Sequence, residues 1–185
     1  LMMQVYKAEM DKTQAAMLEG FDPSMSFDEG LRVQWLNRAR YCLANPLSML
    51  FLEQLRHTPL HEKAMELTGD EMRRVMQAFV ANAIRNGELV RLPLETYWSV
   101  AFAPMYQLVK FHLQGKSLPG RGKFVLTEAM LLQTLELVVK ALKPSPEEKA
   151  TILAEYAAAD SREKKSGRTR STRSAKRKSH RKKTP

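Results

Sequence analysis

The chain has 185 residues, of which 44% are hydrophobic and 27% charged, and this is enough for one folded domain with its own core, with or without a tail. Its single cysteine, Cys42, excludes an internal disulfide framework and a multi-cysteine zinc site. No apolar run approaches the roughly eighteen residues of a membrane span, and the N-terminus does not resemble a signal peptide. We therefore expect a protein of the reducing cytoplasm.

The net charge of +10 is concentrated at the C-terminal end of the chain. Residues 160–185 contain twelve Lys or Arg and two acidic residues, whereas residues 1–159 contain eighteen of each and carry no net charge. Because 160–185 is almost free of apolar residues, we expect a disordered basic tail. Its composition fits contacts with nucleic-acid phosphates and equally a tail that only keeps the protein soluble. The candidate phosphate contacts are Arg168, Arg170, Arg173, Lys176, Arg177 and Lys178.

The body of the chain reads as helices from end to end, because its apolar residues recur three and four apart. The first helix is predicted over 1–18. It has neither a preceding cap nor an initiator methionine, so we expect the chain to begin inside a longer protein. Ser26 and Glu29 form a capping box for a helix that ends near residue 43. An Asn-Pro pair at 45–46 starts the next helix, over about 46–57.

The second half of the body has the widest apolar surfaces. A helix is predicted over 61–86, followed by a helix from Pro93 to Gly115 that is apolar nearly all round. Pro104 lies inside this helix and is expected to kink it. A helix capped by Thr127 follows over 127–143, and a second capping box at 145–148 starts a short last helix that ends near 159.

Few residues have the spacing that catalysis or metal binding requires. His57 and His61 lack a third ligand nearby, and Cys42 has no partner that would activate it, so a buried structural thiol is expected. Residues 120–123 (GRGK) lack the full spacing of a phosphate loop. We predict a protein that is not an enzyme and needs no cofactor or metal.

Aromatic and methionine side chains are the more informative feature. They could line an apolar cavity between helices, a common kind of small-molecule site, or they could simply form the core. The candidates for such a pocket are Trp35, Phe51, Met76, Phe79, Trp98, Phe102 and Tyr106.

Four segments resemble the regulatory domain of TetR/AcrR-type transcriptional regulators. They are 41–46 (YCLANP), 51–59 (FLEQLRHTP), 84–93 (IRNGELVRLP) and 108–115 (LVKFHLQG). The resemblance covers about residues 1–143. It implies an antiparallel bundle, here of about seven helices, in which 1–18 is the connecting helix and 19–143 the effector-binding and dimerisation domain. Residues 144–159 would be an accessory helix, and 160–185 the tail.

The resemblance also implies partners. Such proteins are homodimers that bind a small effector, here a hydrophobic one, and bind DNA through an N-terminal helix-turn-helix that this chain does not contain. Dimerisation would use the helices at 93–114 and 127–143. Their candidate interface residues are Val100, Val109, Leu131, Leu135 and Val138. Two alternatives stay open: a helical protein that associates with nucleic acid through its tail, and an adaptor whose apolar helices bind a different protein.

Overall fold

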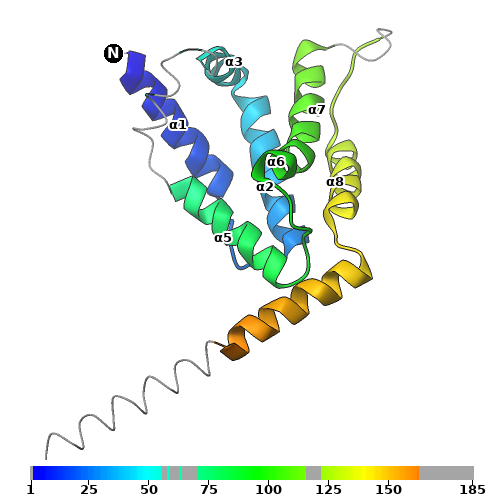
Figure 1. The fold of residues 1–185 in the computed structure, drawn as a ribbon. Coiled ribbons are helices and arrows are strands. Elements are labelled where there is room, and N and C mark those ends of the chain that lie inside the picture. Colours follow the sequence, from blue (N-terminus) through cyan, green and yellow to red (C-terminus); the bar gives the residue numbers. More distant parts are fainter. Residues whose placement is uncertain (1, 56–57, 59–62, 64–70, 116–121, 163–185) are drawn as a thin grey trace, which may run out of the picture.

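The computed structural model of the chain describes residues 2–55, 58, 63, 71–115 and 122–162. Helices and no strand occur in this part of the chain, which confirms the all-α class (Figure 1). The helices are α1 (Met2–Leu18), α2 (Phe27–Ala44), α3 (Pro46–Leu55), α5 (Glu71–Arg85), α6 (Leu94–Ala101), α7 (Ala103–Gln114) and α8 (Glu128–Leu142). One more helix begins at 146 and continues to at least 162.

Local polar contacts begin and end several helices where the sequence predicts. The Thr127 side chain accepts a hydrogen bond from the Met130 amide at the start of α8. The box at Ser145 and Glu148 is reciprocal, since each residue's amide donates to the other's side chain, at 2.8 and 3.2 Å. Gly115 ends α7 in the left-handed conformation, with φ 64°. These contacts are formed within a few residues of the chain and need no tertiary partner.

The two ends of α2 illustrate one confirmed cap and one correction. Ser26 accepts a hydrogen bond from the Glu29 amide, as the capping box predicts. Asn45 does precede the α3 start at Pro46, but its side chain donates backwards to the Tyr41 carbonyl at 3.0 Å. The Asn45 side chain therefore adds a second hydrogen bond at the C-terminus of α2, because the Tyr41 carbonyl also accepts the Asn45 backbone N–H.

Helix α2 is the central element, because it contacts α1, α3, α5, α7 and α8. A helix covered on more than one side buries more than one stripe of residues. Its apolar residues Leu31, Trp35, Ala39 and Cys42 are buried, and so are three polar side chains that face its neighbours: Gln34, Asn37 and Arg38.

The predicted kinked helix at 93–115 is in fact two helices. Helix α6 ends at Ala101, and the backbone of Phe102 (φ −124°) interrupts the helix before α7 begins. Pro104 lies in the first turn of α7, where its missing N–H would have no intrahelical acceptor, so proline is compatible with a helix start there. The expectation of one continuous helix with an internal kink is therefore wrong.

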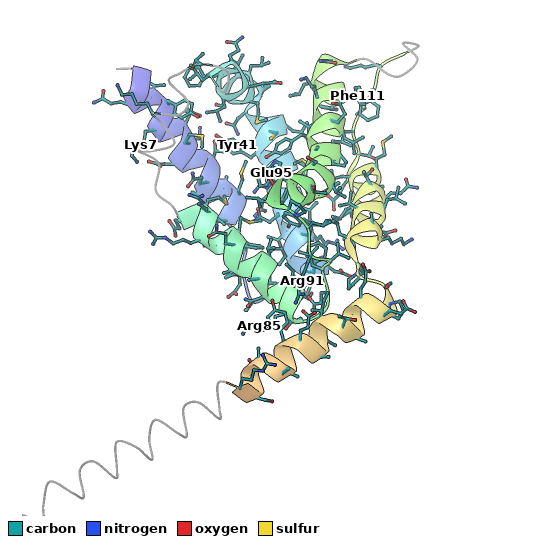
Figure 2. The ribbon with its side chains drawn as sticks, in the orientation of Figure 1. Lys7, Tyr41, Arg85, Arg91, Glu95 and Phe111 are labelled. Atoms are coloured by element: carbon teal, nitrogen blue, oxygen red, sulfur yellow. The ribbon has the colours of Figure 1, made fainter. Side chains whose placement is uncertain are left out.

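The helix at 146–162 packs across the C-terminal end of α5. Ile152 is buried, and Arg91 forms an ion pair with Glu155. The guanidinium groups of Arg85 and Arg91 lie 5.6 and 5.5 Å from the centre of the Tyr156 ring. Both arginines lie on the side of the molecule nearest this helix (Figure 2). The predicted accessory helix thus exists and extends beyond residue 159.

Several predictions fall outside the residues that the structure describes. The helix predicted over 61–86 is described as a helix from Glu71 to Arg85. His57, His61 and all six candidate phosphate contacts of the tail are outside the described ranges. Among the helices that are described, none is long and apolar enough to cross a membrane.

Candidate functional site

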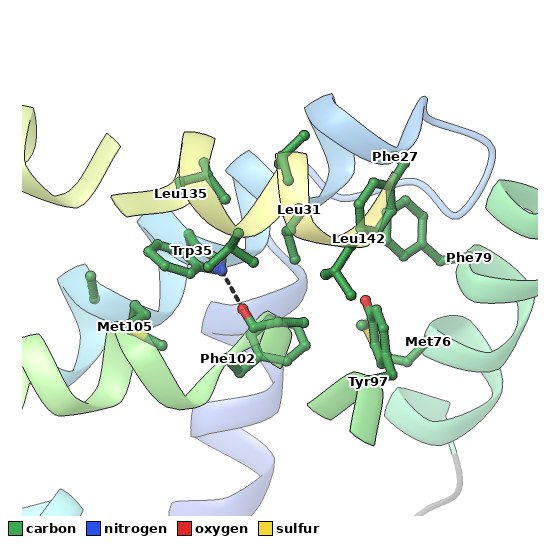
Figure 3. Packing of buried hydrophobic residues seen from close by; sticks show 14 of the residues in the cluster. Phe27, Leu31, Trp35, Met76, Phe79, Tyr97, Phe102, Met105, Leu135 and Leu142 are labelled. Atoms are coloured by element: carbon green, nitrogen blue, oxygen red, sulfur yellow. Dashed lines mark hydrogen bonds between the residues drawn. The ribbon is translucent and has the colours of Figure 1, made fainter. Parts of the chain in front are cut away.

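The seven residues predicted to line a pocket are mostly core residues. Trp35, Phe79 and Phe102 expose no surface, and Met76 is buried with them in one cluster (Figure 3). Phe51 lies apart on α3, with its ring 6.4 Å from that of Tyr6. Buried side chains in contact with one another fill space, so the prediction that all seven line one cavity is wrong for this arrangement.

Two hollows among the described residues have linings that include none of those seven residues. The first lies where α2 begins and α5 and α8 end, and is lined by Ser26, Phe27, Asp28, Gly87, Glu88, Lys143, Pro144 and Lys149. The second lies between α1 and α2, and is lined by Ala16, Glu19, Asn37, Arg40, Tyr41, Ala44 and Asn45.

Three of the predicted residues, Trp98, Phe102 and Tyr106, do converge around Arg38, which was not among the predicted site residues. Arg38, on α2, is only 2% exposed. Its guanidinium lies 4.5 Å from the centre of the Phe102 ring and 5.3 Å from that of Trp98. Its Nη1 donates to the Tyr106 hydroxyl at 3.0 Å. Trp35, also on α2, contacts the same region, because its indole N–H donates to the Ala101 carbonyl at 2.7 Å. We call Arg38, Trp98, Phe102 and Tyr106 the arginine cluster.

The partners of Arg38 are neutral. Nε and Nη2 both donate to the Gln34 side-chain oxygen, at 3.3 and 3.0 Å, and Nη1 also approaches the Met17 sulfur at 3.1 Å. Four ion pairs form within the described ranges, all between exposed side chains, and none involves Arg38. An arginine is rarely buried without an acidic partner, since the charge loses its hydration. This makes Arg38 the most unusual charge in the described structure.

Three features offset part of that cost. The faces of Trp98 and Phe102 carry negative electrostatic potential toward the guanidinium. The Gln34 oxygen accepts two of its N–H groups. The C-terminal end of α1, where Met17 lies, carries about half a negative charge from the helix dipole. None of these contributes a full negative charge, so the charge of Arg38 is only partly balanced within the described residues.

The same polar side chains of α2 bind the C-terminus of α1. The Gln34 amide nitrogen donates to the Met17 carbonyl at 2.8 Å, which turns its oxygen toward Arg38. Asn37 donates to the carbonyls of Met17 and Glu19, at 3.2 and 2.6 Å. These carbonyls lack intrahelical donors. The arginine cluster and the end of α1 are therefore joined through Gln34.

Tyr97 adds a second unusual polar group beside Phe102. Its ring lies edge-on to Phe102, with centres 6.2 Å apart. Its hydroxyl is the one buried side-chain polar atom without a hydrogen-bond partner in the described residues. Burial raises the pKa of Tyr97 well above its usual range, against the opposing effect of the Arg38 charge, so this hydroxyl stays protonated.

Four of the five predicted dimer-interface residues lie inside the protomer. Val109, Leu131, Leu135 and Val138 are between 2 and 6% exposed. A side chain already buried in its own chain has no area left for a partner, so these four assignments are wrong. Val100 is half-buried. The exposed apolar residues of the same helices are Leu94 and Trp98 on α6, Leu113 on α7, and Met130 and Leu137 on α8.

Cys42 and the α7 residue His112 both contact neighbouring residues of the fold. Cys42 is fully buried, its sulfur is 3.2 Å from that of Met49, and burial raises the pKa of its thiol to about 11, which disfavours the reactive thiolate. His112 accepts a hydrogen bond from the Leu126 amide at 3.0 Å. No group of three metal-ligating side chains occurs in the part of the chain that the structure describes.

Comparisons of the chain with protein-family models, curated proteins and solved structures return no match. The arginine cluster and the exposed helix faces are the features of the described structure that bear on function.

Proposed function

We propose that this chain is the regulatory part of a TetR-type transcriptional regulator, which binds a small, largely apolar effector and forms a homodimer. The observation that carries the proposal is the arginine cluster, a buried and incompletely balanced charge surrounded by aromatic rings. Sites that bind small molecules combine such apolar walls with a few polar groups. The order of segments that resembles this family supports the same function.

The connection to α1 supplies a mechanism. An effector can shift a conformational equilibrium only by binding one arrangement more tightly than the other. A ligand that changes the position of Arg38 would also change the hydrogen bonds of Gln34, which donates to the Met17 carbonyl at the end of α1. Helix α1 would pass the change to a DNA-reading module joined to it. The effector and the DNA would then affect each other's binding through one coupling free energy.

Thermal unfolding in the presence of varied apolar ligands tests effector binding. A ligand at one hundred times its Kd stabilises the native state by about 2.7 kcal/mol. For a chain of this size each kcal/mol raises Tm by about 2–4 °C, so a true effector should raise it by roughly 5–11 °C. A broad set of neutral and acidic apolar compounds that leaves Tm unchanged at saturating concentration would contradict the proposal.

Light scattering tests dimerisation. We expect a mass twice the 21.2 kDa of one chain. Leu137 is 63% exposed on α8, so Leu137→Arg should give a monomer with unchanged helix content. Leu47, 80% exposed on α3, provides the matched control, and Leu47→Arg should remain a dimer. A charge at Leu135 would be uninformative, because that side chain is buried and the variant would unfold. A monomeric unmodified chain would refute the dimer.

Association of the basic tail with nucleic acid remains the second candidate. The twelve Lys and Arg residues within 160–185 favour it, because contacts with phosphates supply non-specific affinity. It is compatible with the first proposal, since the tail and the arginine cluster involve different parts of the chain.

A further inference from the structure

The hydrogen-bond acceptors around Arg38 in the arginine cluster are weaker than an anion would be. Of the acceptors around Arg38, the Met17 thioether is weak and the Tyr106 hydroxyl is neutral. The hydroxyl hydrogen of Tyr106 has no acceptor among the residues described, although its oxygen accepts from Arg38. Arg38 Nη1 donates to the Tyr106 hydroxyl and to the Met17 sulfur, so an acceptor that displaces Met17 could engage Nη1 and the Tyr106 hydroxyl, which lie 3.0 Å apart.

The cluster is also close to the surface. Trp98 lies against the guanidinium and yet is 40% exposed, and Tyr106 is half-buried. On the side of α6, the partly exposed indole of Trp98 thus lies next to the guanidinium. Met17, an unbranched and adaptable side chain, lies on another side. A ligand can reach the guanidinium by displacing these two side chains while Trp35 and Phe102 stay in the core.

The surroundings select the charge of the ligand. One guanidinium, with the partial charge at the end of α1 already nearby, can balance a single negative charge. A doubly charged phosphate would keep an unbalanced charge among aromatic rings, which is costly. The planar guanidinium presents paired N–H groups that match the two oxygens of a carboxylate.

We propose that Arg38 and Tyr106 bind the carboxylate of an amphipathic organic acid, whose apolar part lies against Trp98 and Met17. The inference rests on the proposed effector-binding function and names its ligand class. Arg38 holds the carboxylate, Tyr106 donates a second hydrogen bond to it, and the aromatic rings exclude water.

A matched pair of probes tests the charge requirement. Decanoate and decanol have the same chain length and differ in the head group, so their Kd values for the whole chain, measured by calorimetry at neutral pH, isolate the carboxylate. We expect decanoate to bind at least tenfold more tightly, which corresponds to about 1.4 kcal/mol.

Variants then locate the head group. Arg38→Met should weaken decanoate at least tenfold and leave decanol within about twofold. Tyr106→Phe should weaken decanoate by a smaller factor. Arg32 lies exposed on the same helix, and Arg32→Met should leave both probes unchanged. If Arg38→Met does not fold, the Kd values of decanoate and decanol are compared between Tyr106→Phe and the unmodified chain. A selective weakening of decanoate in Tyr106→Phe supports the carboxylate site, and equal values for the two probes overturn it.

The outcomes separate this inference from the function on which it rests. Equal binding of decanoate and decanol, or equal loss of both in Arg38→Met, would overturn the carboxylate site and leave effector binding intact. So would a chain that binds neutral ligands from the broader set but not decanoate. A chain that binds no ligand of any kind would contradict both the carboxylate site and the effector-binding function.

Discussion

Replacing Phe79 by alanine is expected to lower the free energy of unfolding by about 3–5 kcal/mol. The Phe79 side chain is fully buried, with its ring 5.1 Å from that of Phe21 and 6.0 Å from that of Phe27. It lies against α2 at Gly30, where a Cβ atom would come within 2.3 Å of the ring. The side chain thus fills the contact between α5 and α2, and its removal leaves a cavity that the aromatic neighbours cannot close.

Urea unfolding followed by circular dichroism measures this loss, with an unchanged m-value as the sign that only stability changed. Gln77, exposed on the same helix, gives the control, and Gln77→Ala should stay within about 0.5 kcal/mol of the unmodified chain. A loss below about 1 kcal/mol for Phe79→Ala would mean that α5 does not pack on α2 through this ring.

Trp35→Ala is expected to cost a similar 3–5 kcal/mol, for two reasons that a second variant separates. Trp35 is fully buried, and its indole N–H supplies the donor for the Ala101 carbonyl at the end of α6. Trp35→Phe keeps most of the packing and removes the donor, so it should cost about 1–3 kcal/mol. This hydrogen bond satisfies a carbonyl at the C-terminal end of α6, where carbonyls need partners from outside the helix.

Equilibrium unfolding in urea also measures the stabilities of Trp35→Ala and Trp35→Phe. Trp98 is the other tryptophan of the chain and is partly exposed, so Trp98→Phe should cost less than about 1 kcal/mol. If Trp35→Phe were as stable as the unmodified chain, water or another group would satisfy Ala101, and the indole would contribute only its volume.

Part of the fold follows from neighbours along the chain. The ends of α2, α7 and α8 were predicted because Ser26, Thr127 and Gly115 act through hydrogen bonds or backbone angles within a few residues. The all-α class was predicted from the three-and-four spacing of apolar residues. Both kinds of signal are local, and a single sequence contains them completely.

The apolar helices were harder to interpret. Ten of the fifteen residues of α8 are apolar, so their spacing alone did not show which side of the helix faces the core. The structure buries Leu131, Leu135 and Val138, and exposes Met130 and Leu137. The resemblance placed this buried row at a dimer interface, whereas α2, α6 and α7 of the same chain pack against α8.

The helical class, several helix ends and the separation of the basic residues at 160–185 from a neutral body can be read from the order of residues, because each depends on chemistry between near neighbours or on counting. The burial of Arg38 cannot be read from the order of residues. An arginine in a helix of mixed composition looks like a surface residue, and its partners Tyr106 and Phe102 lie more than sixty residues away. Its surroundings are decided only when α1, α6 and α7 pack around α2, since the cost of burying its charge is set by the groups that this packing brings to it.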